Sequence, residues 1–123
     1  MNIGHARRKI TPQGDIYLIG YRNLPNRLEP ATGVHDDVFA NAILFQQDDR
    51  EVFLFNADVL EFEEGMAEEV KTMLAERYGI DRDCVLLSAT HDHTSIVAYH
   101  RSWWTGKFNE GYYRWFLDTI CQC

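Results

Sequence analysis

Residues 84–95 read CVLLSATHDHTS, and the interpretation of the whole chain starts from this stretch. Its apolar first half predicts a buried strand, and its polar second half begins where such a strand ends. In extended backbone, side chains at positions i and i+2 point to the same side. We therefore expect His91 and His93 to point together from the carboxyl end of this strand. Imidazole is a common zinc ligand and a proton carrier near neutral pH, so the pair is a candidate metal or acid–base site.

The segments before this stretch predict an α/β fold. Apolar residues recur at helical spacing from Glu63 to Tyr78, and Gly79 follows as a typical residue after a helix end. The apolar segment 52–59 precedes this helix, and the histidine-bearing strand follows it. A strand, a helix and a second strand in this order form a βαβ unit, whose two strands run parallel.

Further strands complete a mixed sheet in this prediction. Residues 47–50 have the polar composition of a hairpin connection, which makes the strands on either side antiparallel. Residues 22–33 contain two prolines and a glycine among polar neighbours, so they are expected to form a loop. The additional strands are expected at residues 3–10, 16–21 and 38–46.

Length and composition place the chain among ordinary globular domains. The chain has 123 residues, which suits a single domain with its own core. A net charge of −7 argues against a nucleic-acid partner, which would favour clustered lysines and arginines. The sequence contains no apolar run of the length that spans a membrane and no secretory signal. Three cysteines without framework spacing fit a reducing compartment, so a cytoplasmic location is expected.

Asp58 and His35 are further candidates for lining the same site. Sites in βαβ units collect at the carboxyl ends of the parallel strands, which places Asp58 on the same rim as the histidines. The alternative for Asp58 is a structural role, capping the loop before the helix. His35 stands before two carboxylates, Asp36 and Asp37, in the loop that leads into a strand. The alternative for this triplet is ordinary solvated turn chemistry.

Taken together, these motifs resemble the N-terminal part of the neutral/alkaline non-lysosomal ceramidase family. The resemblance rests on GVHD at 33–36 before a strand, FLFNAD at 53–58 before a helix, and VLLSATHDH at 85–93. The order and spacing agree across essentially the whole chain. The resemblance implies that residues 1–123 form the N-terminal part of a larger ceramidase-like catalytic domain.

The resemblance also implies a chemistry. Members of this family are zinc amidases that cleave the N-acyl bond of ceramide, and their zinc is held by two His, a Glu and a Tyr. By this resemblance His91 is a zinc ligand, and His93 is a catalytic residue that contacts the substrate or intermediate. The implied substrate is ceramide or a related lipid-like N-acyl compound. The family motif continues Ser-Gly-Pro, whereas this chain has Thr94, Ser95 and Ile96.

The remaining zinc ligands of the family lie further downstream than Cys123. The last predicted helix, at 110–120, carries aromatic residues that have little sequence left to pack against. We therefore expect residues 1–123 to be a truncated single domain that is inactive alone and self-associates through exposed sheet edges. The aromatic residues between Trp103 and Phe116 are expected in a core or interface, with an acyl-chain groove as the alternative.

Two other functions are compatible with a His-x-His motif after a strand. A non-catalytic domain would keep the fold and a weak metal affinity without hydrolysing anything. A metallo-β-lactamase-type hydrolase would continue the motif with x-Asp-His, but Ser95 and Ile96 occupy those two positions. This substitution argues against the second alternative.

Overall fold

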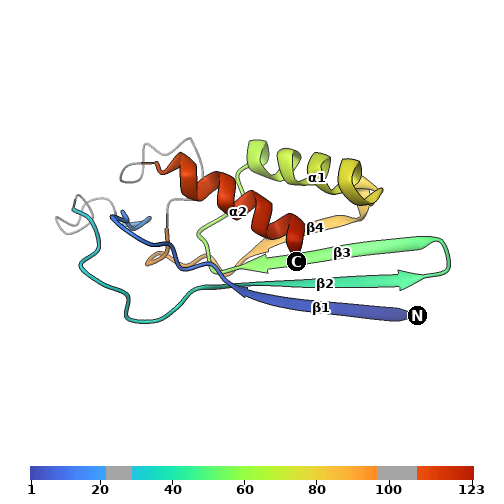
Figure 1. Ribbon diagram of the computed structural model, residues 1–123, viewed down its shortest axis with the longest axis horizontal. Coiled ribbons are helices and arrows are strands. Elements are labelled where there is room, and N and C mark those ends of the chain that lie inside the picture. The colour runs from blue at the N-terminus through green and yellow to red at the C-terminus, as the bar shows by residue number, and fades with distance from the viewer. Residues whose placement is uncertain (22–28, 97–107) are drawn as a thin grey trace.

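The computed structural model describes residues 1–21, 29–96 and 108–123 of the chain. Within these ranges four strands form one sheet in the order β1-β2-β3-β4, and α1 and α2 lie on the same side of it (Figure 1). This architecture confirms the predicted α/β class. The elements are β1 (Asn2–Lys9), β2 (Phe39–Gln47), β3 (Arg50–Ala57), α1 (Glu64–Tyr78), the short 3₁₀ turn η2 (Arg82–Cys84), β4 (Val85–Ala89) and α2 (Glu110–Gln122).

The sheet is mixed, as the sequence predicts. β1 pairs antiparallel with β2, and β2 pairs antiparallel with β3 through the predicted hairpin. β3 and β4 run parallel, in register from Phe53 opposite Val85 to Ala57 opposite Ala89, and α1 joins them. The βαβ unit is therefore confirmed, and the carboxyl ends of β3 and β4 lie next to each other.

Local sequence signals account for the ends of these elements. The N–H of Gly79 donates to the carbonyl of Ala75 at 2.9 Å, and the φ of +72° at Gly79 ends α1 in the left-handed conformation that glycine adopts without strain. In the β2–β3 turn, Asp48 has a φ of +53°, which aspartate tolerates better than most residues.

The strand predicted at residues 16–21 is wrong. In the structure this segment makes a single antiparallel bridge, between Leu18 and Ile96. Gly20 and Tyr21 have φ values of +81° and +50°, so the backbone leaves the extended conformation directly after the bridge. The apolar run here supplies two adjacent buried positions, Ile19 and Gly20, in an irregular loop.

The last helix packs on the core, contrary to the expectation that its aromatic residues have little to contact. Phe116 is fully buried, and its ring centroid lies 6.4 Å from that of Phe55 in β3 and 6.2 Å from that of Phe62. The core expectation therefore holds for α2. Trp103 and Trp104, which the same expectation included, lie outside the described residues.

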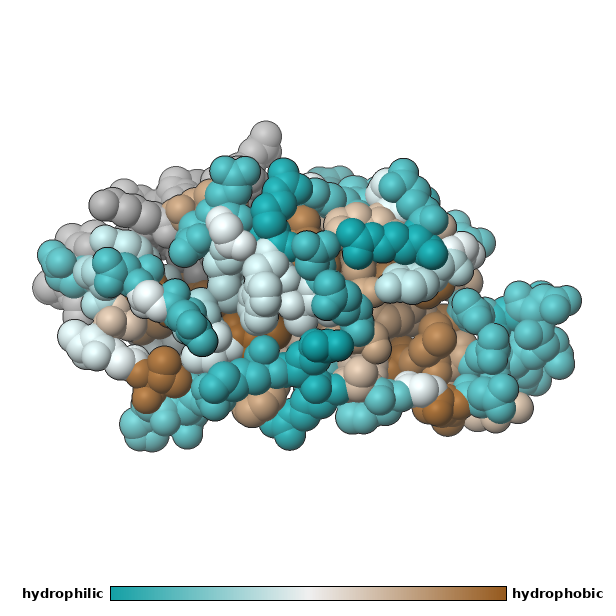
Figure 2. Space-filling model, viewed as in Figure 1, coloured by the Kyte–Doolittle hydropathy of each residue, from teal (hydrophilic) through white to brown (hydrophobic). Residues whose placement is uncertain are grey.

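The surface is mostly hydrophilic on the face that Figure 2 shows, with apolar residues in separate patches. The strand order makes β1 and β4 the edge strands, and most residues of β1 are exposed. Self-association through these edges stays a prediction. Neither helix of the described part is long and apolar enough to span a bilayer.

Candidate functional site

The site is built where β3 and β4 end. Beyond the last strand residues, the N–H of Thr90 donates to the carbonyl of Ala57 at 3.0 Å. Two residues further along both segments, the N–H of Asp92 donates to the carbonyl of Val59 at 3.2 Å. These bonds hold the loop after β4, residues 90–96, against the loop after β3. The two loops together position the histidines.

His91 is held by its backbone and by one ring nitrogen. Its φ of +62° is left-handed, an uncommon conformation for a residue with a Cβ. Its Nδ1 lies 2.8 Å from the carbonyl oxygen of Leu60. Because a carbonyl only accepts, Nδ1 carries the hydrogen and Nε2 keeps a free lone pair. The ring is therefore oriented with its ligating nitrogen away from Leu60.

The two histidines converge, although not by the predicted route. β4 ends at Ala89, and His91 is left-handed, so the i and i+2 rule for extended backbone does not apply here. The turn nevertheless brings the Nε2 atoms of His91 and His93 to 3.3 Å, with the ring planes at 80° to each other. The expected convergence is present, and its cause is a turn.

His93 has one ring nitrogen sealed from solvent. Its Nδ1 is buried and has no hydrogen-bond partner among the described residues. The other nitrogen, Nε2, faces the lone pair of His91. A buried N–H without an acceptor is costly, so the hydrogen of the neutral ring belongs on Nε2, where His91 accepts it. The pair is thus a hydrogen-bonded couple in which His93 is the donor.

The segment 16–21 forms one wall of this site. The N–H of Ile19 donates to the carbonyl of Ser95 at 2.9 Å, and Gly20 and Tyr21 follow beside His93. The ring of Tyr21 lies 4.9 Å from that of His93, at 45°. The sequence contains no motif that points to Gly20 or Tyr21, so sequence reasoning missed both. Their role depends on a contact between segments more than seventy positions apart.

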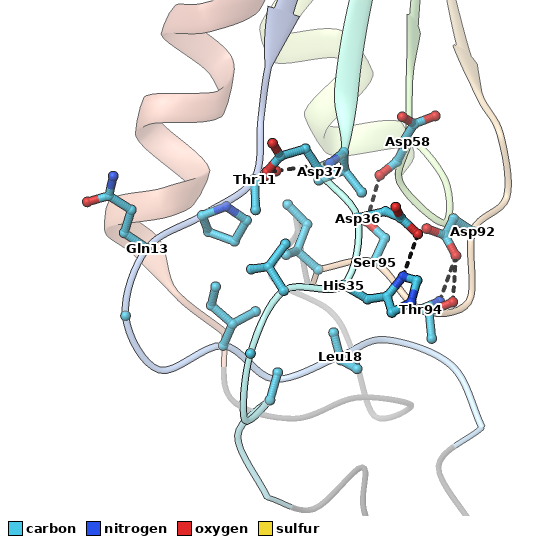
Figure 3. A pocket seen from close by; sticks show the side chains of 18 residues that line it. Thr11, Gln13, Leu18, His35, Asp36, Asp37, Asp58, Asp92, Thr94 and Ser95 are labelled. Atoms are coloured by element: carbon cyan, nitrogen blue, oxygen red, sulfur yellow. Dashed lines mark hydrogen bonds and ion pairs between the residues drawn. The ribbon is translucent and has the colours of Figure 1, made fainter.

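The rest of the 90–96 loop is fixed by short polar contacts. The Oδ1 of Asp92 accepts from the N–H and the hydroxyl of Thr94, at 2.8 and 2.9 Å. The hydroxyl of Ser95, which is buried, donates to the carbonyl of Asp58 at 2.6 Å. These contacts, drawn in Figure 3, give the loop a fixed shape.

Asp58 lies on the rim, but its carboxylate holds the sheet. Its Oδ2 accepts from the N–H of Phe39 at 2.8 Å, while its own N–H donates to the carbonyl of Phe39 at 2.9 Å. This double contact ties the start of β2 to the end of β3. These contacts of Asp58 are structural, but they join two strands and do not cap the loop before the helix.

His35 is almost fully exposed, with its Nδ1 2.7 Å from the Oδ2 of the equally exposed Asp36. The third member of this triplet, Asp37, accepts from the hydroxyl of Thr11 at 2.8 Å and from Lys9 at 3.2 Å. The hydrogen bond from Thr11, and then the one from Lys9, lower the pKa of Asp37. The triplet is a solvated loop beside the rim.

A cavity of about 780 Å³ lies beside the histidine-bearing loop (Figure 3). Its lining includes the candidates His35 and Asp58, and also Asp92 and Thr94, but neither His91 nor His93. The loop therefore contributes Asp92, Thr94, Ser95 and Ile96 to the cavity, while the histidine couple lies outside its lining. The four predicted site residues thus fall into two pairs, the histidine couple and the cavity-lining His35 and Asp58.

Comparison with known proteins gives one consistent result. A family model described as neutral/alkaline non-lysosomal ceramidase, N-terminal, matches residues 1–123. The neutral ceramidase structure from Pseudomonas aeruginosa aligns with a TM-score of 0.81 and 22% identity, over 98% of this chain and 20% of that chain. A structure of a ceramidase complexed with C2 aligns with a TM-score of 0.76 and 20% identity, over 97% of this chain and 19% of that chain.

The two structural matches establish the shared fold, and this chain spans only a small part of either ceramidase. The family model, in contrast, covers the whole of this chain. The chain therefore belongs to the neutral/alkaline non-lysosomal ceramidase family and represents its N-terminal region.

Proposed function

We propose that this chain is the N-terminal part of a zinc-dependent amide hydrolase that cleaves the N-acyl bond of ceramide or a related lipid-like compound. Family membership supports this proposal. The observation that carries it is the histidine couple, with His91 and His93 converging to 3.3 Å at the carboxyl ends of parallel strands.

The donor set fits part of a zinc site. His91 has its Nδ1–H fixed by a backbone carbonyl and its Nε2 unprotonated, which is the usual state of a zinc-binding histidine. A zinc ion on the Nε2 of His91 would take the lone pair that accepts from His93 in the metal-free chain, and His93 would then stand beside the metal as a hydrogen-bond donor. Within ranges 1–21, 29–96 and 108–123, no group of three or more His, Cys, Asp or Glu residues that could hold a metal ion is found, either at the couple or elsewhere.

The two histidines are assigned different roles. His91 is the metal ligand, and zinc, when bound, would supply Lewis-acid activation of water and of the amide carbonyl. His93 carries its hydrogen on Nε2, so it can donate to an oxygen that gains negative charge or pass a proton to the departing amine. His35 and Asp58 are assigned to the neighbouring cavity and to no chemical step.

Zinc titration of the 123-residue chain tests the assignment of the metal ligand. The chain should bind zinc weakly, because it supplies only part of a four-ligand set. His91→Ala should lower the affinity by more than ~10-fold, whereas His93→Ala should leave it nearly unchanged. An equal loss in both variants would make His93 a second ligand. Tight zinc binding that survives His91→Ala would place the metal elsewhere.

Amide hydrolysis tests the activity. The 123-residue chain should not cleave a fluorescent N-acyl sphingoid base, because part of a ligand set does not hold zinc in a catalytic geometry. A longer polypeptide that contains this chain should cleave it, and His91→Ala should abolish the activity. His93→Ala should retain the metal and lower turnover by roughly 10²–10⁴-fold, as for other positioned acid–base groups.

The incomplete ligand set among the described residues favours one alternative, a non-catalytic domain with weak metal affinity. The same hydrolysis assay separates the two functions. Zinc binding without hydrolysis, in every longer polypeptide that contains the chain, would support the non-catalytic domain.

A further inference from the structure

The contact between Gly20 and His93 is closer than any side chain at position 20 would permit. A Cβ built at Gly20 would lie 2.7 Å from the Nδ1 of His93 and 3.0 Å from its Cβ and Cγ. Among the glycines of the described residues, Gly20 is the one where an added Cβ approaches within 3.0 Å of another atom. The backbone of the 16–21 loop therefore lies directly against the imidazole ring.

This contact also explains why the Nδ1 of His93 is buried without a partner among the described residues. Position 20 offers a Cα rather than a donor or acceptor to that nitrogen, and Tyr21 lies against the ring as well. An Nδ1 sealed in this way does not favour a hydrogen, so the neutral ring keeps its hydrogen on Nε2. The packing against the Nδ1 of His93 thus determines that Nε2, on the opposite edge of the ring, is the donor.

We propose that Gly20 is a positioning residue, whose missing side chain seats His93 with its Nε2–H directed at His91. Gly20 itself touches no reacting atom. The loop that carries it is held to the histidine-bearing loop by the bond from Ile19 to Ser95 and by the bridge between Leu18 and Ile96. A Cβ at position 20 therefore moves the ring, because both loops are fixed. The catalytic meaning of this placement rests on the proposed function, whereas the placement itself does not.

The test is histidine NMR on the 123-residue chain labelled with ¹⁵N and ¹³C, compared with Gly20→Ala and Gly79→Ala. Gly79 is the matched control, because its φ of +72° carries the same backbone strain while nothing lies within 4 Å of an added Cβ. In the unmodified chain, long-range ¹H–¹⁵N spectra should show His91 with its hydrogen on Nδ1 and His93 with its hydrogen on Nε2. An NOE should connect the α-hydrogens of Gly20 to the ring of His93.

Gly20→Ala should remove the single tautomer of His93 and change its ring shifts, while Gly79→Ala should retain both. If Gly20→Ala does not fold, Gly20→Asn replaces it, because asparagine tolerates a positive φ better and still adds a Cβ. An unchanged His93 spectrum in a folded Gly20 variant would overturn the proposal. If neither variant folds, the NOE in the unmodified chain decides, and its absence overturns the proposal.

Zinc binding distinguishes failure of this proposal from failure of the proposed function. Gly20→Ala should keep the zinc affinity of the unmodified chain, because His91 and its bond to Leu60 are untouched. If the unmodified chain binds no zinc but Gly20→Ala still alters the His93 tautomer, the proposed function fails and the positioning role stands. If zinc binds as expected and the tautomer does not change, the positioning role fails alone.

Discussion

The sheet and the two helices differ in backbone geometry from the loops that carry the candidate site. We call the sheet and helices the body, and the loops at 16–21 and 90–96 the rim. In the body, β3, β4 and the two helices bury apolar side chains such as Phe55 and Phe116 completely, with helix and strand geometry throughout. At the rim, His91 and Tyr21 are two of the three non-glycine residues with positive φ in the described chain, and the Nδ1 of His93 is buried without a partner. Irregular backbone and unpaired polar atoms are costly, and a stable scaffold holds them in place.

This difference separates the contacts that stabilise the fold from the contacts that fix the geometry of the site. The core contacts of the body stabilise the fold through burial of apolar area. The rim holds conformations that local preferences disfavour, and the bonds to Leu60 and Ala57 attach it to the ends of the strands. Substitutions in the body should therefore change stability, whereas substitutions at the rim should change the site with small effects on stability.

The largest expected effect is on the core. Phe116→Ala should lower the free energy of unfolding by about 3–5 kcal/mol, because a fully buried ring in contact with Phe55 and Phe62 leaves a cavity. Trp115→Ala, one position earlier on the same helix, is the control, since Trp115 is 44% exposed. Urea denaturation followed by circular dichroism measures both. Equal losses in the two variants would show that α2 is not seated on the sheet as described.

The same contrast explains how much the sequence could predict. The body follows periodic patterns, so α1 was expected at Glu63–Tyr78 and is found at Glu64–Tyr78, with Gly79 at its end. β4 was expected because an apolar run follows that helix. Such patterns work because each element buries one face and its ends satisfy local hydrogen bonds.

The rim was predicted only in outline. The convergence of His91 and His93 was expected from extended backbone, but the φ of +62° at His91 produces it instead. The segment 16–21 was expected as a strand, and its contact with His93 was not foreseen. A left-handed residue and a contact between distant loops leave no periodic signal, because both depend on the assembled sheet.

A smaller effect is expected from pH, again in the body. Burial, and then the hydrogen bond to Glu69, raise the pKa of Tyr113 to about 12, compared with 10.0 for an ordinary tyrosine. Between these pH values the unfolded chain loses the proton while the folded chain keeps it, so stability falls as pH rises. Below pH 10 this contribution is fully present.

Urea denaturation below pH 10 and between pH 10 and 12 checks this prediction, with tyrosinate absorbance as a second readout. Tyr113→Phe is the control variant, because it removes the titrating hydroxyl and should make the alkaline fall in stability shallower. A fall of the same steepness in both proteins would assign the effect to other groups.

The smallest expected effect measures the strain at the rim directly. His91→Gly and His91→Ala both remove the imidazole and its bond to Leu60, so they differ only in the Cβ. Because His91 has a left-handed backbone, His91→Gly should be more stable than His91→Ala by about 1 kcal/mol, the reverse of the usual order. His5 in β1 is the control, since its extended backbone should make His5→Ala the more stable variant. Urea denaturation of the four variants gives both differences. If His91→Ala were instead more stable than His91→Gly, as expected at position 5, the backbone at position 91 would relax without strain. The difference between rim and body would then lie in hydrogen bonding alone.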